Sequence, residues 1–273
     1  MSPDDDVRDA LDRLSRVYGE GSLRACVLAL VMDDAMEAVR TVWREETADV
    51  PGAADLLATV ARLGAAFRLP VLDALLARVR DEPKADRRRL LQAFRRIMAA
   101  RGTVRPLDRL QWLQMRRQLG DRPLAPPVPA VAFDGDEPDR LPPVMRLQVA
   151  AVTAYLSRIV PDGSPERGGE WYAAVLQRFM PLDAGIPRAL PDGDRLASAL
   201  DEVITLPWML RPVLLRAWVD AALGLTWGAD LARDTADALR LAASLLDSPM
   251  APVLARHHGV VGWAETMHRA VPR

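Results

Sequence analysis

The residues with the clearest potential for chemistry are the three histidines, which all lie near the C-terminus. His257, His258 and His268, together with Glu265, could supply nitrogen and oxygen ligands to a metal ion. Adjacent histidines on a helix, however, point about 100° apart, and no second group of ligands accompanies them. We therefore favour an exposed C-terminal tail over a metal site, and we expect no cofactor.

An acidic cluster in a proline-rich stretch looks faintly like a calcium-binding loop. Its members are Asp134, Asp136, Glu137 and Asp139. The cluster lacks the glutamate that closes such a loop at its twelfth position, and Pro138 does not fit the loop geometry. A solvated linker is the better interpretation.

Nucleophilic catalysis has one weak candidate. Cys26 is the only cysteine, and it would need a histidine brought from the far C-terminus to activate it. It lies in an apolar run, 25–32, where a buried and unreactive thiol is more typical. The chain also lacks a P-loop and the motifs GxSxG, GxGxxG and CxxC. We therefore expect a protein that is not an enzyme.

The strongest electrostatic feature is an arginine-rich stretch, 84–122. It holds twelve basic and three acidic side chains, a local charge of +9 in a chain whose net charge is −1. Such a patch could bind anionic lipid headgroups, nucleic acid or the acidic remainder of the protein, and self-pairing or plain solvation is the simplest interpretation. The candidate anion-binding residues are Arg88, Arg95, Arg96, Arg101 and Arg105.

The elements that must carry these residues are predicted to be helices. Half of the 273 residues are hydrophobic but only 5% are aromatic, and the excess consists of alanine and leucine, which favour helix. Alternating β-branched runs, which would indicate strands, are absent. A chain of this length can bury a large core in one or two domains. We predict an all-α protein.

The most apolar stretch, 207–225, has a fainter copy at 83–101. A helix with so few charged positions is normally surrounded by other helices. About forty residues after each copy begins, the pattern Asp-x-Pro-x-Ala-Pro recurs, at 121–126 and 247–252. We interpret the two as a tandem repeat of one helical unit. The predicted cores of the repeats are Leu90, Leu91 and Phe94 in the first and Leu214, Leu215 and Trp218 in the second.

The repeat predicts two related helical bundles. The N-terminal half, 1–119, would hold the first unit and the C-terminal half, 144–273, the second. The stretch 120–143 is rich in proline and acidic residues, which is typical of a linker.

The chain carries no signal for secretion or membrane insertion. Residues 1–6 are acidic where a signal peptide needs a basic region, and no segment approaches the ~20 apolar residues that span a bilayer. A single cysteine excludes an intrachain disulfide and suits a reducing cytosol. We expect a cytoplasmic protein, with a membrane-peripheral location as the alternative.

Three stretches carry a family resemblance: 29–40, which begins ALVMD; 68–76, which reads RLPVLDALL; and 200–252. They resemble the cytosolic helical region that follows the membrane segments in bacterial zinc metallopeptidases of the HtpX/CAAX-prenyl endopeptidase family. That region itself resembles the tellurite-resistance TerB-like helical fold. The resemblance implies tandem TerB-like units, and it covers roughly residues 25 to 255.

The resemblance does not extend to the catalytic part of that family. The zinc-binding HExxH motif and the membrane helices of these peptidases are missing. TerB-like units carry an acidic turn, Asp-Gly-x-x followed by Glu. The turns here read 101–104, RGTV, with Asp108 following, and 225–228, LTWG, with Asp234 following. Because the first carboxylate is absent from both copies, we do not expect an inherited metal site.

These observations rank three functions. We expect a non-catalytic helical module that binds another protein or regulates it. The first alternative is a peripheral binder of anionic membrane or, less favoured, nucleic acid through the 84–122 patch. The second is an accessory subunit of a separately encoded HtpX-type zinc peptidase.

Overall fold

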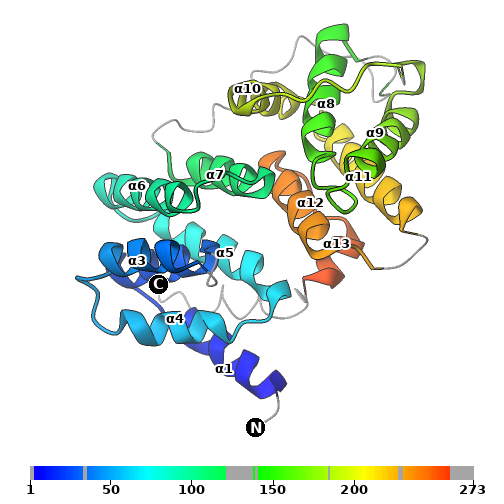
Figure 1. The fold of residues 1–273 in the computed structure, drawn as a ribbon. Coiled ribbons are helices and arrows are strands. Elements are labelled where there is room, and N and C mark those ends of the chain that lie inside the picture. Colours follow the sequence, from blue (N-terminus) through cyan, green and yellow to red (C-terminus); the bar gives the residue numbers. More distant parts are fainter. Residues whose placement is uncertain are drawn as a thin grey trace. The chain divides into compact units, whose positions relative to one another are not determined.

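The computed structural model describes residues 3–32, 36–120, 138, 141–183, 185–226 and 230–258. Every regular element within these ranges is helical, and they contain no strand. The prediction of an all-α protein is therefore confirmed (Figure 1). None of the helices in this part of the chain is both long enough and apolar enough to cross a membrane.

Contacts between residues divide the chain into two compact units. Among the described residues, the first unit holds 3–104, 115–120 and His258, and the second holds 105–114 and the residues from Pro138 to His257. The sequence pattern grouped all of 106–119, which forms one helix, with the N-terminal half. Contacts instead assign its residues up to Gln114 to the second unit and the rest to the first. Most of the predicted linker, 120–143, lies outside the described residues, so the linker and the tandem repeat stay predictions.

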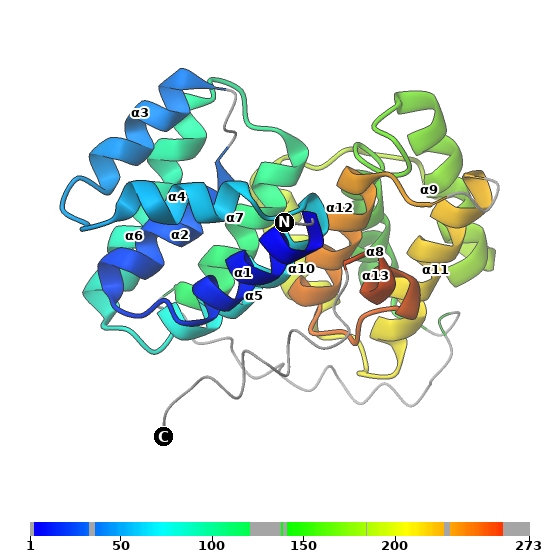
Figure 2. The same cartoon turned by 90° about the horizontal axis from the view of Figure 1, so that it is seen from below.

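The first unit is built around one apolar helix. Its helices are α1 (Pro3–Ser15), α2 (Glu20–Val31), α3 (Glu37–Glu46), α4 (Ala53–Ala61), α5 (Ala65–Val79) and α6 (Lys84–Ala100). Helix α2 contacts α3, α4, α5 and α6, and Figure 2 shows it among α4 and α6. Its residues from Leu23 to Val31 are all buried. A helix that is apolar on every side is stable only when other helices surround it, which explains its central place.

The second unit contains the predicted central helix. Its helices are α8 (Pro143–Leu156), α9 (Pro165–Phe179), α10 (Gly193–Val203), α11 (Leu210–Leu225), α12 (Arg233–Leu245) and α13 (Pro252–His257), with a 3-10 turn, η2, at Pro181–Asp183 and the first part of α7 (Pro106–Leu119). Helix α8 packs on α9 and α10, and α11 packs on α9 and α12 (Figure 1).

Trp218 of α11 lies at the centre of this unit. Its side chain is 0% exposed, and its indole Nε1 donates a hydrogen bond of 3.0 Å to Thr153 Oγ1 on α8. Trp171 of α9 in turn donates a hydrogen bond of 3.1 Å to the backbone carbonyl of Trp218. Leu214 and Leu215 are buried beside it. Two buried indoles thus find partners, as an N–H group removed from water requires.

Candidate functional site: the charged sides of helix α6

Helix α6 is held in place by a narrow apolar face. Leu90, Phe94 and Ile97 are buried and follow the i, i+4, i+7 spacing that puts side chains on one side of a helix. This face packs against α2 and α3. Leu91, which the sequence pattern placed in the core, is only half-buried, because it lies about 100° around the helix from Leu90, at the edge of the apolar face.

Arg89 and Arg96 lie seven residues apart on one flank of α6 and bind carboxylates of their own unit. Arg96 donates to Glu46 through both Nε and Nη2, the latter at 2.7 Å. Arg89 Nη2 donates to Asp49 Oδ2 at 3.0 Å. The Glu46 side chain is only 9% exposed, and its hydrogen bonds raise the pKa of Arg96 above the ordinary value. Arg96 therefore pairs with an acidic residue of its own chain, which is one of the roles that the sequence left open for the arginine-rich stretch.

A buried arginine ties this flank to the central helix. The Arg24 side chain on α2 is 1% exposed and forms ion pairs with Glu20 and with Asp49, the latter at 2.6 Å. The hydrogen bond from Arg24 is the main cause that lowers the pKa of Asp49 below its usual value. A buried charge is tolerated only when it is paired in this way. Asp49, shared by Arg24 and Arg89, thus links α2 to α6.

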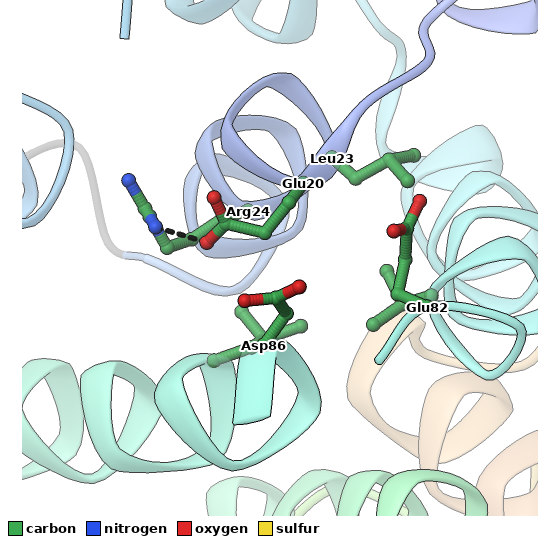
Figure 3. Close-up of a pocket in the computed structure, with 7 residues that line it drawn as sticks. Glu20, Leu23, Arg24, Glu82 and Asp86 are labelled. Atoms are coloured by element: carbon green, nitrogen blue, oxygen red, sulfur yellow. Dashed lines mark hydrogen bonds and ion pairs between the residues drawn. The ribbon is translucent and has the colours of Figure 1, made fainter. Parts of the chain in front are cut away.

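A small pocket opens beside Arg24 (Figure 3). It has room for no more than about one water molecule, whereas small-molecule sites typically enclose roughly 300 to 1,000 Å³. Within the described ranges, no group of three or more histidine, cysteine or acidic side chains could hold a metal ion. The pocket is therefore too small for an organic ligand. Its lining residues are Glu20, Leu23, Arg24, Val79, Glu82, Asp86 and Leu90.

Arg88 and Arg95 form a second arginine stripe on α6. Each precedes Arg89 or Arg96 by one residue, so the two stripes are about 100° apart around the helix. Lys84 lies one turn before Arg88 and extends this stripe. All three side chains are exposed. Of the five predicted anion-binding arginines, Arg88 and Arg95 are exposed on this stripe, whereas Arg96, also exposed, lies on the neighbouring one.

The remaining two candidate arginines have structural contacts. Arg101 donates from Nη2 to the carbonyl of Val31, at the C-terminal end of α2, where helix carbonyls need outside donors. Arg105 belongs to the second unit and pairs with Asp108, at 3.0 Å from Nη2 and 3.3 Å from Nε. Asp108 also accepts the backbone N–H of Arg105 at 3.1 Å. Arg96, Arg101 and Arg105 thus make contacts within their own unit, and anion binding by the five arginines stays a prediction.

The other predicted chemistry has these outcomes. Burial raises the pKa of the Cys26 thiol to about 12, so the reactive thiolate is strongly disfavoured. His258 is buried, with Nδ1 at 3.3 Å from the carbonyl of Ala66, whereas we expected an exposed tail. Glu265 and His268 lie outside the described residues, as does the calcium-like cluster.

The sequence did not lead us to two features: the buried Arg24, and the exposed apolar residues at the N-terminal start of α11. A signal for Arg24 was present, because a single charged residue interrupts an apolar run and Glu20 stands one turn before it. Trp208 was grouped with the central helix, yet its side chain is 73% exposed, next to the partly exposed Met209 and Val213. Nothing in the sequence distinguishes this tryptophan from the buried Trp218 except its place before the first turn.

Comparison with known proteins adds no relative. No protein-family model, no curated protein and no solved structure matches the chain. The resemblance to the cytosolic region of HtpX-type peptidases stays a prediction, and the function must be argued from the residues alone.

Proposed function

We propose that this chain is a non-catalytic helical interaction module that binds a protein partner through the exposed basic stripe of α6, namely Lys84, Arg88 and Arg95. The observation that carries the proposal is a row of exposed cations on one side of α6. Lys84, Arg88 and Arg95 are exposed and lie at i, i+4 and i+11, a spacing that places them on the same side of the helix.

The stripe has the properties of a docking surface for negative charge. Lys84 and Arg88 stand at i and i+4, where like charges disfavour an isolated helix. Negative charge brought alongside offsets this repulsion. The carboxylates of Asp49 and Glu46 lie on the other flank of α6, where they pair with Arg89 and Arg96. Such complementarity gives specificity and fast association more than affinity.

An anionic membrane or nucleic acid is the second candidate for the same stripe. Membrane-binding basic clusters usually contain four to eight lysines or arginines. The stripe has three, and Arg89 and Arg96 beside it are paired. A protein partner with a few carboxylates matches this smaller number better. The family resemblance adds an HtpX-type zinc peptidase as one possible partner, with this chain as its accessory subunit.

The experiment compares three anionic probes with two matched variants. The full chain is titrated with a polyglutamate peptide, with phosphatidylserine-containing vesicles and with duplex DNA, at low and at high salt. We expect salt-sensitive binding that is tightest for the peptide, because screening weakens contacts between exposed charges. Arg88→Gln/Arg95→Gln, which changes the net charge by the same amount as the control, should abolish it. Arg89→Gln/Arg96→Gln, in the paired stripe, should leave it nearly unchanged.

Three results would contradict the proposal. Tighter binding to vesicles or DNA than to peptide selects the second candidate. Absence of binding to every probe at low salt shows that α6 is not the surface. Hydrolytic activity that a single substitution removes shows that the chain is an enzyme after all.

A further inference from the structure

Helix α11 leaves one side open to solvent, although most of its residues are buried. Its inner sides pack on α9 and α12 (Figure 1). The open side is a line of five residues at steps of four, three, four and three, the repeat at which one helix packs along another. These residues, here called the α11 seam, are Met209, Val213, Arg216, Asp220 and Leu223. At 1.5 Å per residue the seam is about 21 Å long.

The α11 seam is apolar towards its two ends. Met209 and Val213 are 45% and 46% exposed, and Leu223 is half-buried. Met209 has helical backbone angles, φ −67° and ψ −33°, so it continues the line although it precedes the first residue of α11. Trp208, directly before the seam, is largely exposed. Large apolar side chains that stay in water next to one another are typical of a binding surface.

The middle of the seam is an ion pair that contributes little to its own helix. Arg216 Nε lies 3.7 Å from Asp220 Oδ2, and the two side chains are 81% and 51% exposed. Water and salt screen such a pair, so it adds little to stability. A guanidinium has five N–H donors and a carboxylate accepts several hydrogen bonds. Both groups can therefore bind a second helix while they keep their present contact.

The order of residues along the seam is self-complementary. A two-fold symmetric contact pairs residue i with residue j and residue j with residue i. When two α11 helices lie antiparallel with the axis at the level of residue 218, each Arg216 faces the Asp220 of the other copy. The same axis places each Val213 opposite the Leu223 of the other copy, because both pairs of positions have 218 as their midpoint. One arrangement thus matches the charges and the apolar residues together.

We infer that the α11 seam is the contact surface of a weak homodimer in which two copies of this helix pack antiparallel. The four charges in the middle alternate in sign, and apolar contacts flank them on both sides. Trp208 of each copy covers the last turn of α11 in the other copy. A contact along about 21 Å of one helix is smaller than the roughly 800 Å² per partner of a standard interface, so the dimer is reversible. This surface belongs to the second unit, and the inference is independent of the basic stripe on α6.

Other occupants match the seam less well. Parallel packing of two copies would place Arg216 against Arg216 and Asp220 against Asp220, and like charges oppose association. A membrane would accept Trp208, Met209 and Val213, but the ion pair in the middle of the line would then have to leave water.

The test is sedimentation velocity of the full chain at low salt, from about 1 to about 500 μM, a range that covers weak association. We expect a reversible equilibrium of monomer and dimer. Arg216→Asp and Asp220→Arg each bring like charges together across the axis, so each alone should weaken association at least about tenfold. Arg195→Asp, a charge reversal at an exposed position on α10, should leave association unchanged.

Mixing the two single variants tests the antiparallel pairing directly. One variant carries two acidic residues in the middle of the seam and the other carries two arginines. An equimolar mixture of Arg216→Asp and Asp220→Arg should therefore form a heterodimer, although neither variant dimerises alone. The double variant Arg216→Asp/Asp220→Arg, which exchanges the charges, should dimerise again. Both positions are exposed, and far-ultraviolet circular dichroism of each variant checks that the helices are retained.

Four results would overturn the inference. A chain that stays monomeric up to about 500 μM does not form this contact. A dimer that both single variants retain uses another surface. Loss of the dimer in both variants, without a heterodimer on mixing, excludes the antiparallel pairing. A monomer that binds phosphatidylcholine vesicles, with binding lost in Trp208→Ala, identifies a membrane surface instead.

Discussion

The structure predicts that replacing Trp218 by alanine destabilises the second unit strongly. The side chain is 0% exposed, and it is the largest group of α11 enclosed by neighbouring helices. Removal of a buried tryptophan or phenylalanine typically costs about 3 to 5 kcal/mol, through lost transfer free energy and the cavity left behind. The indole hydrogen bond to Thr153, about 1 kcal/mol net, is included in that range.

The chain offers its own control. Trp208 lies ten residues earlier and is 73% exposed, so Trp208→Ala should change the free energy of unfolding by less than about 0.5 kcal/mol. Trp218→Phe keeps most of the volume and removes the indole N–H. The Thr153 hydroxyl still donates to the carbonyl of Val149 at 2.8 Å, so we expect an intermediate loss of about 1 to 2 kcal/mol.

Urea unfolding followed by far-ultraviolet circular dichroism measures all three variants on the same scale. The change in midpoint, multiplied by an unchanged slope, gives the loss of stability. The expected order is Trp218→Ala, then Trp218→Phe, then Trp208→Ala. A loss below about 1 kcal/mol for Trp218→Ala, or equal losses for the two alanine variants, would refute the central place of α11.

Further predictions concern the first unit. Arg24→Met removes hydrogen bonds to Glu20 and Asp49, whose carboxylates are partly exposed and regain water contacts, so it should cost about 1 to 3 kcal/mol, whereas Arg89→Met, at a half-exposed pair, should cost no more than about 1 kcal/mol in the same urea assay. Because the pKa of Asp49 is lowered in the fold, its contribution is complete above the unfolded pKa and is lost as pH falls through the folded pKa. Asp49→Asn should therefore flatten the fall of stability with acid in a series of melts, and an unchanged slope would contradict this linkage. Cys26 should react with a thiol reagent at pH 8 only after unfolding, since burial raises its pKa to about 12 and keeps it protonated; rapid labelling of the native chain would show that the thiol is accessible.

Much of the local structure follows from short-range patterns. The apolar patterns of 83–101 and 207–225 predicted helices, and the structure has α6 and α11 within these stretches. The nearly continuous apolar face around Leu214 predicted a surrounded helix, and Leu214 and Trp218 are buried. The 3.6-residue period is a property of the chain itself, so it can be read from neighbouring residues alone.

How far each side chain is buried required the tertiary structure. Leu91 and Leu215 occupy equivalent places in the two sequence patterns, yet Leu215 is 1% exposed and Leu91 is half-buried. The buried residues of α11 occupy a wider arc of their helix than those of α6. Sequence periodicity gives the direction of a side chain, whereas its burial depends on how many neighbouring helices cover that direction.

By itself, the sequence determined that this chain is helical and that α6 is rich in arginine. Only the tertiary structure decided which carboxylate an arginine reaches. Arg96, for example, pairs with Glu46, fifty residues earlier in the chain. An ion pair requires its two groups to lie within a few ångströms, and contacts between distant segments, not local pattern, bring them together.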